Sequence, residues 1–166
     1  YSIGQSFSIK WGNGENMKSN YPKVGAGAVI IKDGKTLLTK RKGSHSSGMW
    51  GSFGGHVKFG ETPIEAAKRE AMEELGIEID NFTFITCMNL IKEDRHYIDI
   101  TFVAEIISGE PTIQEPHRIE EIGWYSLDNL PSPLFEPVKI VLESLKTGEK
   151  YFEIKDVDEK RNAKYN

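Results

Sequence analysis

Cysteine is nearly absent from this sequence of 166 residues, in which Cys87 is the only one. A single cysteine cannot form a disulfide within the chain, and it cannot supply the cysteine cluster of a zinc site. Long apolar runs are also missing, because none approaches the roughly 18 residues of a membrane-spanning helix. Residues 1–10 lack the basic start and the apolar block of a signal peptide. We therefore expect a cytoplasmic protein with no membrane partner.

An excess of positive charge is missing as well. The sequence has 21 Lys and Arg residues against 25 Asp and Glu residues, which gives a formal net charge of −4. A mildly acidic protein does not attract duplex nucleic acid over a broad surface, so we expect no such partner. A small nucleotide substrate remains compatible with this charge, because a divalent cation can supply positive charge locally.

The length of the chain fits one domain with a core of its own. Residues 1–20 are rich in Gly, Ser and Asn, and we interpret them as an N-terminal extension. Residues 21–149 are the expected domain, and residues 150–166 are expected to be a charged, frayed C-terminal tail. The oligomeric state stays open, since the extension could add a strand to a homodimer.

Hydrophobic patterns typical of strands and of helices both occur in this domain. Strands are predicted at residues 24–31, 36–40, 82–90, 97–107 and 122–125, with a strand or turn at residues 50–56. Asp33-Gly34 predicts a hairpin turn. Helices are predicted at residues 62–75 and at residues 138–145, where Val138, Val141, Leu142 and Leu145 share a face. The mixture predicts an α/β fold, in which helices flank a mixed β-sheet as an α-β-α sandwich.

The boundaries of the first helix are marked by its sequence. Thr62 is a suitable N-cap, Pro63 suits the first helical position, and Glu65 occupies the position of a capping box. Gly76 is placed to end the helix in the left-handed conformation.

Three glutamates crowd one side of this helix. Glu70, Glu73 and Glu74 are spaced so that their carboxylates project from the same side. Their repulsion weakens an isolated helix by roughly a few tenths of a kcal/mol per pair. A solvated acidic face is the simplest interpretation of such a run. A divalent cation such as Mg²⁺ or Mn²⁺ would instead convert the repulsion into binding, since both prefer oxygen ligands.

A fixed spacing joins the glutamates to the glycine-rich segment before the helix. The pattern runs Gly55, five residues, Glu61, seven residues, Arg69-Glu70-Ala71, one residue, Glu73-Glu74, one residue, Gly76-Ile77. At average residue frequencies its fixed positions match by chance with odds on the order of 10⁻⁸ per starting position. A solvated face does not explain this spacing. The spacing is that of the Nudix box, so the chain resembles the Nudix hydrolase family and is expected to share the Nudix fold.

Outside the box, residues 23–145 resemble the MutT-like nucleoside triphosphate pyrophosphohydrolases, and in particular the thiopurine-hydrolysing Nudix subgroup. The similar segments are residues 41–44, 54–61, 96–97, 115–124 and 130–135. One departure concerns Ser52-Phe53, where those relatives commonly have Leu-Pro. Loss of the proline frees the backbone before the two glycines, so we expect an effect on the substrate more than on the metal.

The resemblance implies hydrolysis of a nucleoside diphosphate linked to a group X, with Mg²⁺ or Mn²⁺ as cofactor. Its implied metal ligands are Glu70, Glu73, Glu74, Glu120 and the carbonyl of Gly54. Glu70 would also deprotonate the attacking water, Glu73 would assist, and Arg69 would position one of them. Implied substrate contacts are Arg41, Ser44, His45 and Phe53.

Several alternatives remain open at this point. Glu115 and Glu121 are rivals of Glu120 as the ligand from outside the helix. Cleavage of a nucleoside triphosphate to monophosphate and pyrophosphate is the first hypothesis, and cleavage of ADP-ribose or a nucleotide sugar is the second. A noncatalytic, nucleotide-sensing Nudix domain is a third hypothesis, which the complete set of box glutamates disfavours.

Overall fold

The computed structural model describes residues 21–43, 46–92 and 95–156. The predictions for residues 1–20, Ser44, His45 and residues 157–166 lie outside these ranges. Its strands are β1 (Lys23–Lys32), β2 (Lys35–Arg41), β3 (Trp50–Gly51), β4 (Phe53–His56), β5 (Glu78–Lys92), β6 (Arg95–Ser108), β7 (Ile119–Ser126) and β8 (Tyr151–Asp156). Its helices are α1 (Pro63–Leu75) and α2 (Glu136–Thr147). No helix in the described ranges is both long and apolar enough to cross a membrane.

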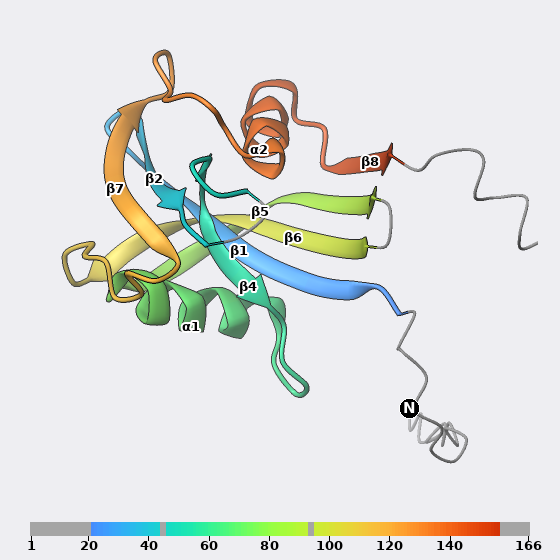
Figure 1. The fold of residues 1–166 in the computed structure, drawn as a ribbon, viewed down its shortest axis with the longest axis horizontal. Coiled ribbons are helices and arrows are strands. Elements are labelled where there is room, and N and C mark those ends of the chain that lie inside the picture. Colours follow the sequence, from blue (N-terminus) through green and yellow to red (C-terminus); the bar gives the residue numbers. More distant parts are fainter. Residues whose placement is uncertain (1–20, 44–45, 93–94, 157–166) are drawn as a thin grey trace, which may run out of the picture.

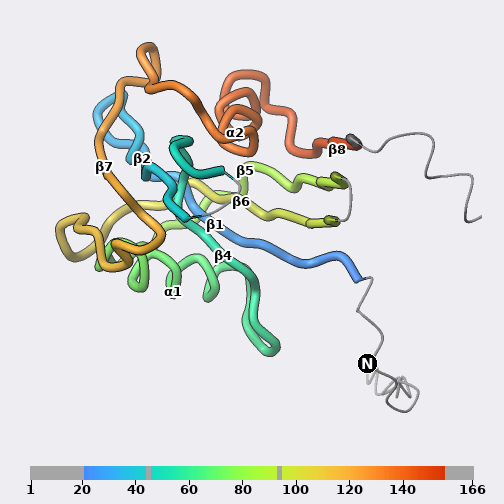
Figure 2. Tube along the Cα trace, in the orientation of Figure 1, coloured from blue at the N-terminus to red at the C-terminus, as the bar shows by residue number. Residues whose placement is uncertain are grey.

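The strands form a mixed sheet with the two helices on opposite sides of it (Figure 1). Its larger part has the order β4-β1-β6-β5-β8, in which β1 and β6 are parallel and so are β5 and β8. β2 leaves β1 through the predicted turn, whose residues Asp33 and Gly34 have φ angles of 50° and 71°. β2 then pairs with β3 and β7, so that this second part curls away from the first (Figure 2). The arrangement confirms the predicted α/β fold.

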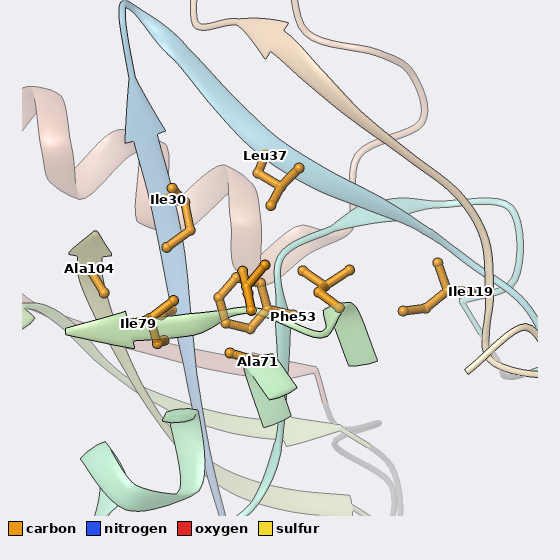
Figure 3. Packing of buried hydrophobic residues seen from close by; sticks show 10 residues of the cluster. Ile30, Leu37, Phe53, Ala71, Ile79, Ala104 and Ile119 are labelled. Carbon is orange, nitrogen blue, oxygen red and sulfur yellow. The ribbon is translucent and has the colours of Figure 1, made fainter. Parts of the chain in front are cut away.

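The main core lies between α1 and the sheet. Ala71 and Leu75 of α1 are fully buried, and Phe53 of β4 is 2% exposed among them. Figure 3 shows the Phe53 ring surrounded by Ile30, Leu37, Ala71 and Ile79. This cluster fixes α1 against β4, and it therefore fixes the side of α1 that carries the glutamates.

The buried face of α2 differs at one position from the apolar face that the sequence predicts. Val138, Val141 and Leu142 are buried as expected, but Leu145 is 37% exposed. Ser144 is buried instead, and its hydroxyl donates a hydrogen bond to the Ile85 carbonyl at 3.3 Å. A short hydroxyl side chain with a carbonyl partner can occupy a buried position that a pattern of apolar residues does not reveal.

The prediction of a frayed tail at residues 150–166 is wrong for its first part. Tyr151–Asp156 form β8, which pairs in parallel with β5 from Cys87 to Lys92. Phe152 and Ile154 are partly buried, whereas the residues that alternate with them are exposed. This period of two is typical of an edge strand, and the charged residues of its outer face concealed it.

The ends of α1 are those that the sequence predicts. The Thr62 hydroxyl accepts the Glu65 N–H at 3.2 Å, and the Glu65 carboxylate accepts the Thr62 N–H at 2.7 Å. Gly76 ends the helix with a φ of 66°. The capping box thereby sets the helical register in which the three glutamates follow.

We predict that Thr62→Ala lowers the free energy of unfolding by about 1 kcal/mol, because α1 loses its N-cap. Urea denaturation of both proteins measures the difference. Thr112→Ala is the matched control, since the Thr112 hydroxyl accepts only an exposed hydrogen bond from Gln114. Equal losses in the two variants would contradict a specific role of the cap.

Candidate active site

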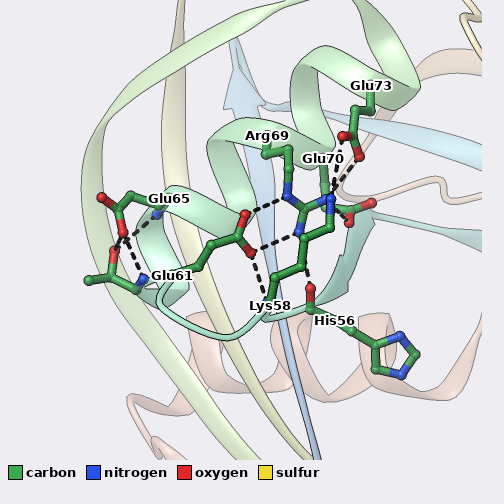
Figure 4. Close-up of polar contacts among 8 residues, drawn as sticks. His56, Lys58, Glu61, Glu65, Arg69, Glu70 and Glu73 are labelled. Atoms are coloured by element: carbon green, nitrogen blue, oxygen red, sulfur yellow. Dashed lines mark hydrogen bonds and ion pairs between the residues drawn. The ribbon is translucent and has the colours of Figure 1, made fainter.

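Arg69 connects the loop before α1 to the helix itself (Figure 4). Its Nε donates to Glu61 Oε1 at 2.7 Å and its Nη2 donates to Glu61 Oε2 at 3.1 Å, which is a bidentate pair. Nη2 also donates to the His56 carbonyl at 3.0 Å. The hydrogen bonds from Arg69, with one from the Lys58 N–H, lower the pKa of Glu61 to about 2. Glu61 is therefore ionised at neutral pH and acts as the anchor of Arg69.

The same guanidinium contacts two of the three crowded glutamates. Arg69 Nη1 donates to Glu70 Oε1 at 2.5 Å and to Glu73 Oε2 at 2.9 Å. Glu73 is exposed, and its second oxygen lies 3.8 Å from Lys58 Nζ. Arg69 thus has the contacts that a positioning residue requires, and it offsets the repulsion between the two carboxylates.

Glu70 is buried against the glycine backbone of β4. Its side chain is 7% exposed, and a Cβ at Gly55 would lie only 2.6 Å from Glu70 Oε2. Glu70 Oε2 is buried and has no hydrogen-bond partner among the described residues. A side chain at position 55 would therefore displace this carboxylate, and its Oε2 is left to a partner other than the described residues.

Glu74 is buried one turn further along α1. The pKa of Glu74 is raised to about 7, mainly by burial and to a smaller extent by the charges of Glu70 and Glu115. Arg118, whose Nη2 lies 3.7 Å from Glu74 Oε1, opposes this effect, as does a hydrogen bond from the Gly54 N–H. Without a bound cation, the surroundings of Glu74 thus favour its protonated form more than those of an ordinary glutamate do.

The described residues contain no ready-made cluster of three His, Cys, Asp or Glu side chains for a metal ion. The donor chemistry nevertheless fits a hard divalent cation, because Glu70 and Glu74 are buried carboxylates and Glu70 Oε2 is unpartnered. A cation there would compete with Arg69 for Glu70 and with Arg118 for Glu74. Gly54, the expected carbonyl ligand, has a φ of 155°, and a Cβ there would lie 2.7 Å from the Ala26 carbonyl.

Outside α1, the predicted ligand Glu120 and its rivals Glu115 and Glu121 lie in different surroundings. Glu120 is exposed on β7, and its carboxylate contacts Lys40 Nζ at 3.3 Å; Glu121 lies 3.9 Å from the same nitrogen. Glu115 is more buried, pairs with Arg118 at 3.0 Å and is the loop glutamate whose charge acts on Glu74. Glu120 stays a predicted ligand, and Glu115 is the rival that the structure brings to the site.

Two adjoining cavities lie beside these carboxylates. The smaller, of about 200 Å³, is lined by Glu74 and by basic residues that include Arg41, Lys42 and Arg118. The larger, of about 310 Å³, borders the Gly54-Gly55 backbone. Arg41, Ser52 and Arg118 line both cavities. One substrate can therefore span them, with its anionic part beside Glu74.

The Arg41 guanidinium is partly buried beside both cavities. Its guanidinium carbon lies 4.8 Å from the centre of the Phe135 ring, and its Nε is buried without a hydrogen-bond partner among the described residues. Burial lowers the pKa of Arg41, and the nearby Glu74 opposes that change. An anionic substrate would relieve this buried cation, which agrees with the contact expected for Arg41.

The other expected substrate contacts fare differently. Ser44 and His45 lie outside the described residues. Phe53 borders the larger cavity, and its ring is packed in the main core, so it stays a predicted substrate contact. Sequence reasoning missed Arg118, which contacts Glu74 and lines both cavities. Its position after Glu115-Pro116 was the available signal, although no fixed spacing ties it to the helix.

Comparison with known proteins identifies the pattern. A family model described as "NUDIX domain" matches residues 21–145. The chain is 32% identical over 128 residues to an ADP-ribose pyrophosphatase of Methanocaldococcus jannaschii, covering 76% of this chain and 75% of that protein. It is 32% identical over 112 residues to the NAD-capped RNA hydrolase NudC of Chromobacterium violaceum, covering 67% of this chain but only 41% of NudC. The structure of a MutT NUDIX hydrolase from Burkholderia pseudomallei superposes with a TM-score of 0.72 at 40% identity, covering 75% of this chain and 98% of that one.

We predict that Gly55→Ala weakens Mn²⁺ binding about tenfold or more, because the new methyl group displaces the Glu70 carboxylate. Isothermal titration calorimetry measures the affinity. Gly51→Ala is the control, since a Cβ there would meet its nearest atoms at 3.7 Å, an ordinary contact. Unchanged Mn²⁺ affinity in a folded Gly55→Ala protein would exclude Glu70 from the site.

The raised pKa of Glu74 predicts how stability depends on pH in the metal-free protein. Between its ordinary value of 4.5 and the folded value of about 7, the folded state binds more protons than the unfolded state. The free energy of unfolding should therefore fall as pH rises through this window, by at most about 3 kcal/mol. Urea denaturation in chelator at several pH values measures the slope.

Glu74→Gln is the control for this titration, because glutamine cannot ionise. Its slope should be smaller than that of the parent protein, and the slope that remains includes Asp99, whose pKa burial also raises. Identical slopes in the two proteins would show that Glu74 titrates normally.

Proposed function

This chain belongs to the Nudix family and is a Nudix hydrolase that acts on nucleotide-linked substrates, and we propose that it cleaves a nucleoside triphosphate to a nucleoside monophosphate and pyrophosphate. The observation that supports this choice is the pair of joined cavities. One combines basic side chains with Glu74, which suits a polyphosphate, and the other has partly apolar walls, which suits a nucleoside. Arg41 and Arg118, shared by both cavities, would bind phosphates between these two parts.

Nudix hydrolases use divalent metal ions, and we propose Mg²⁺ or Mn²⁺ for this chain. Glu70, Glu74 and the Gly54 carbonyl would hold it, with Glu73 and either Glu115 or Glu120 completing the set. The bound ion supplies neutralisation of phosphate charge and a lower pKa of the attacking water.

The roles of the chain's own residues follow from their contacts. Glu70 would take a proton from the attacking water, and its Oε2, which has no partner among the described residues, is the oxygen open to the metal ion. Arg69 orients Glu70 through the bond to Oε1 before the metal ion binds, and it would hold Glu73 in the metal-bound site. Arg41, stacked on Phe135, would orient the substrate phosphates, because most of phosphoryl-group catalysis is positioning and electrostatics.

A second candidate is cleavage of ADP-ribose or a related nucleotide. The observation in its favour is the 32% identity to an ADP-ribose pyrophosphatase over 75% of that protein's length. The thiopurine-hydrolysing subgroup, the cytoplasmic location and a homodimer formed through residues 1–20 stay predictions from the sequence.

The test is a panel of nucleoside triphosphates, ADP-ribose and nucleotide sugars incubated with Mg²⁺, with products separated by ion-exchange chromatography. We expect pyrophosphate from at least one triphosphate, and kcat/KM for that substrate should exceed the value for ADP-ribose. Turnover should cease in excess chelator. Release of single phosphates, preference for ADP-ribose, or full activity in chelator would each contradict the proposal.

Glu74→Gln supplies the matched test of the site in the same panel. It should lower kcat/KM by roughly two orders of magnitude or more while leaving the melting temperature nearly unchanged. Glu78→Gln is the control, because Glu78 is exposed at the start of β5 and lies outside both cavities. Retained activity in Glu74→Gln would remove Glu74 from its proposed role.

A further inference from the structure

The larger cavity contains a carboxyl group that the proposed phosphate chemistry does not use. Asp99 of β6 lines this cavity and lies in parallel register beside Gly25 of β1. A Cβ at Gly25 would lie 2.7 Å from Asp99 Oδ2. Because residue 25 is a glycine, the Asp99 carboxyl can lie directly over β1.

One oxygen of this carboxyl is held and the other is free. The Thr101 hydroxyl donates to Asp99 Oδ1 at 3.0 Å, and Thr101 itself is 3% exposed. The two residues alternate along β6, so their side chains project from the same face of the sheet. Within the described ranges, no residue forms a hydrogen bond with Asp99 Oδ2. Burial raises the pKa of Asp99, which favours the protonated form of the carboxyl.

The surroundings of Asp99 select the kind of group that could accept this hydrogen bond. Leu90, Pro137 and Val141 line the same cavity, and they provide apolar surface beside the carboxyl. The cavity volume of about 310 Å³ lies in the range of small-molecule sites. Arg41, Arg95 and Arg118 also line this cavity, and Arg41 and Arg118 line the smaller one too, so phosphates would lie where the two cavities meet. A flat heterocycle, with apolar faces and a polar edge, fits the apolar surface beside Asp99.

We propose that Asp99 is a specificity-determining residue, whose carboxyl donates a hydrogen bond to an acceptor nitrogen or carbonyl oxygen on the edge of the substrate's base. Thr101 is the positioning residue that orients this carboxyl. The inference rests on the proposed function in one respect, that the base belongs to a nucleotide with phosphates near Arg41 and Arg118. The inference goes beyond the proposed function by naming Asp99 as the residue that binds the base, and by requiring a hydrogen-bond acceptor on the edge of that base.

The experiment measures binding in chelator by isothermal titration calorimetry, so that it does not depend on turnover. The probes are the 5′-monophosphates of adenosine, guanosine, cytidine and uridine, with ribose 5-phosphate as the probe without a base. The ratio of the ribose 5-phosphate Kd to the lowest nucleotide Kd measures what the base contributes. Asp99→Ala should lower this ratio roughly fivefold, as expected for one lost hydrogen bond.

Asp99→Asn distinguishes a donor from a carboxylate acceptor. Asparagine can accept from Thr101 through its oxygen and donate to the base through its amide nitrogen, so the ratio should stay within about twofold of the parent value. Thr101→Val removes the orienting hydroxyl from a buried side chain of similar shape, and it should lower the ratio less than Asp99→Ala does. Asp128→Ala is the control at an exposed aspartate outside both cavities, and it should leave the ratio unchanged.

An unchanged ratio in Asp99→Ala, or a loss in Asp99→Asn as large as that in Asp99→Ala, would overturn the inference. If Asp99→Ala does not fold, the other two variants test the proposal. An unchanged Kd ratio in Asp99→Asn together with a lower ratio in Thr101→Val supports it, and any other pattern overturns it. Equal affinity for nucleotides and ribose 5-phosphate in a protein that hydrolyses triphosphates would refute this inference alone. An intact base contribution without any hydrolysis would refute the proposed function alone.

Discussion

The site is organised by the burial of two carboxylates of α1 against the glycine backbone of β4. Ala71 and Leu75 pack into the main core beside Phe53, so this side of the helix cannot move away from the sheet. Glu70 and Glu74 lie on the packed side, and both are 6% exposed. Burying two like charges is costly unless cations accompany them. Arg69 and Arg118 accompany them in the structure, each from a different segment, and a divalent ion would do so in their place.

The anchoring of Arg69 determines how the site can respond to such an ion. Its bidentate bond to Glu61 and its bond to the His56 carbonyl do not involve Glu70 or Glu73. Arg69 can therefore lose its contact with either carboxylate and still stay attached to the loop before α1. Arg118 has a comparable second partner in Glu115. Arg69 can therefore lose Glu70, and Arg118 can lose Glu74, while each arginine keeps another partner. This lowers the free-energy cost of replacing the arginines with a metal ion at the two carboxylates.

The parts of this protein that the sequence predicts well depend on local spacing. The box positions, the Thr62 cap and the Gly76 stop all lie within one helix and its flanks, where residue spacing fixes geometry directly. The missed features depend on contacts between distant segments. Arg118 forms an ion pair with Glu74, the Ser144 hydroxyl donates a hydrogen bond to the Ile85 carbonyl, and β8 pairs with β5. The sequence ranks Glu120 before Glu115 as a ligand, but it does not show that the charge of Glu115 acts on Glu74, because that depends on the fold of the loop before β7.

The two halves of the site are built from different elements, and this separation bears on specificity. Glu70 and Glu74 come from α1, whereas Asp99 and Thr101 come from β6, in a cavity that β1, β4 and the region of α2 also line. Changes along β6 can therefore alter the group that is bound without disturbing α1. Relatives of this chain at the same 32% identity carry the names of enzymes for ADP-ribose and for NAD-capped RNA, so overall identity does not fix the substrate. The residues that line the larger cavity are those that can distinguish one substrate from another, and among them Asp99 is a partly buried carboxyl with one oxygen bonded to Thr101.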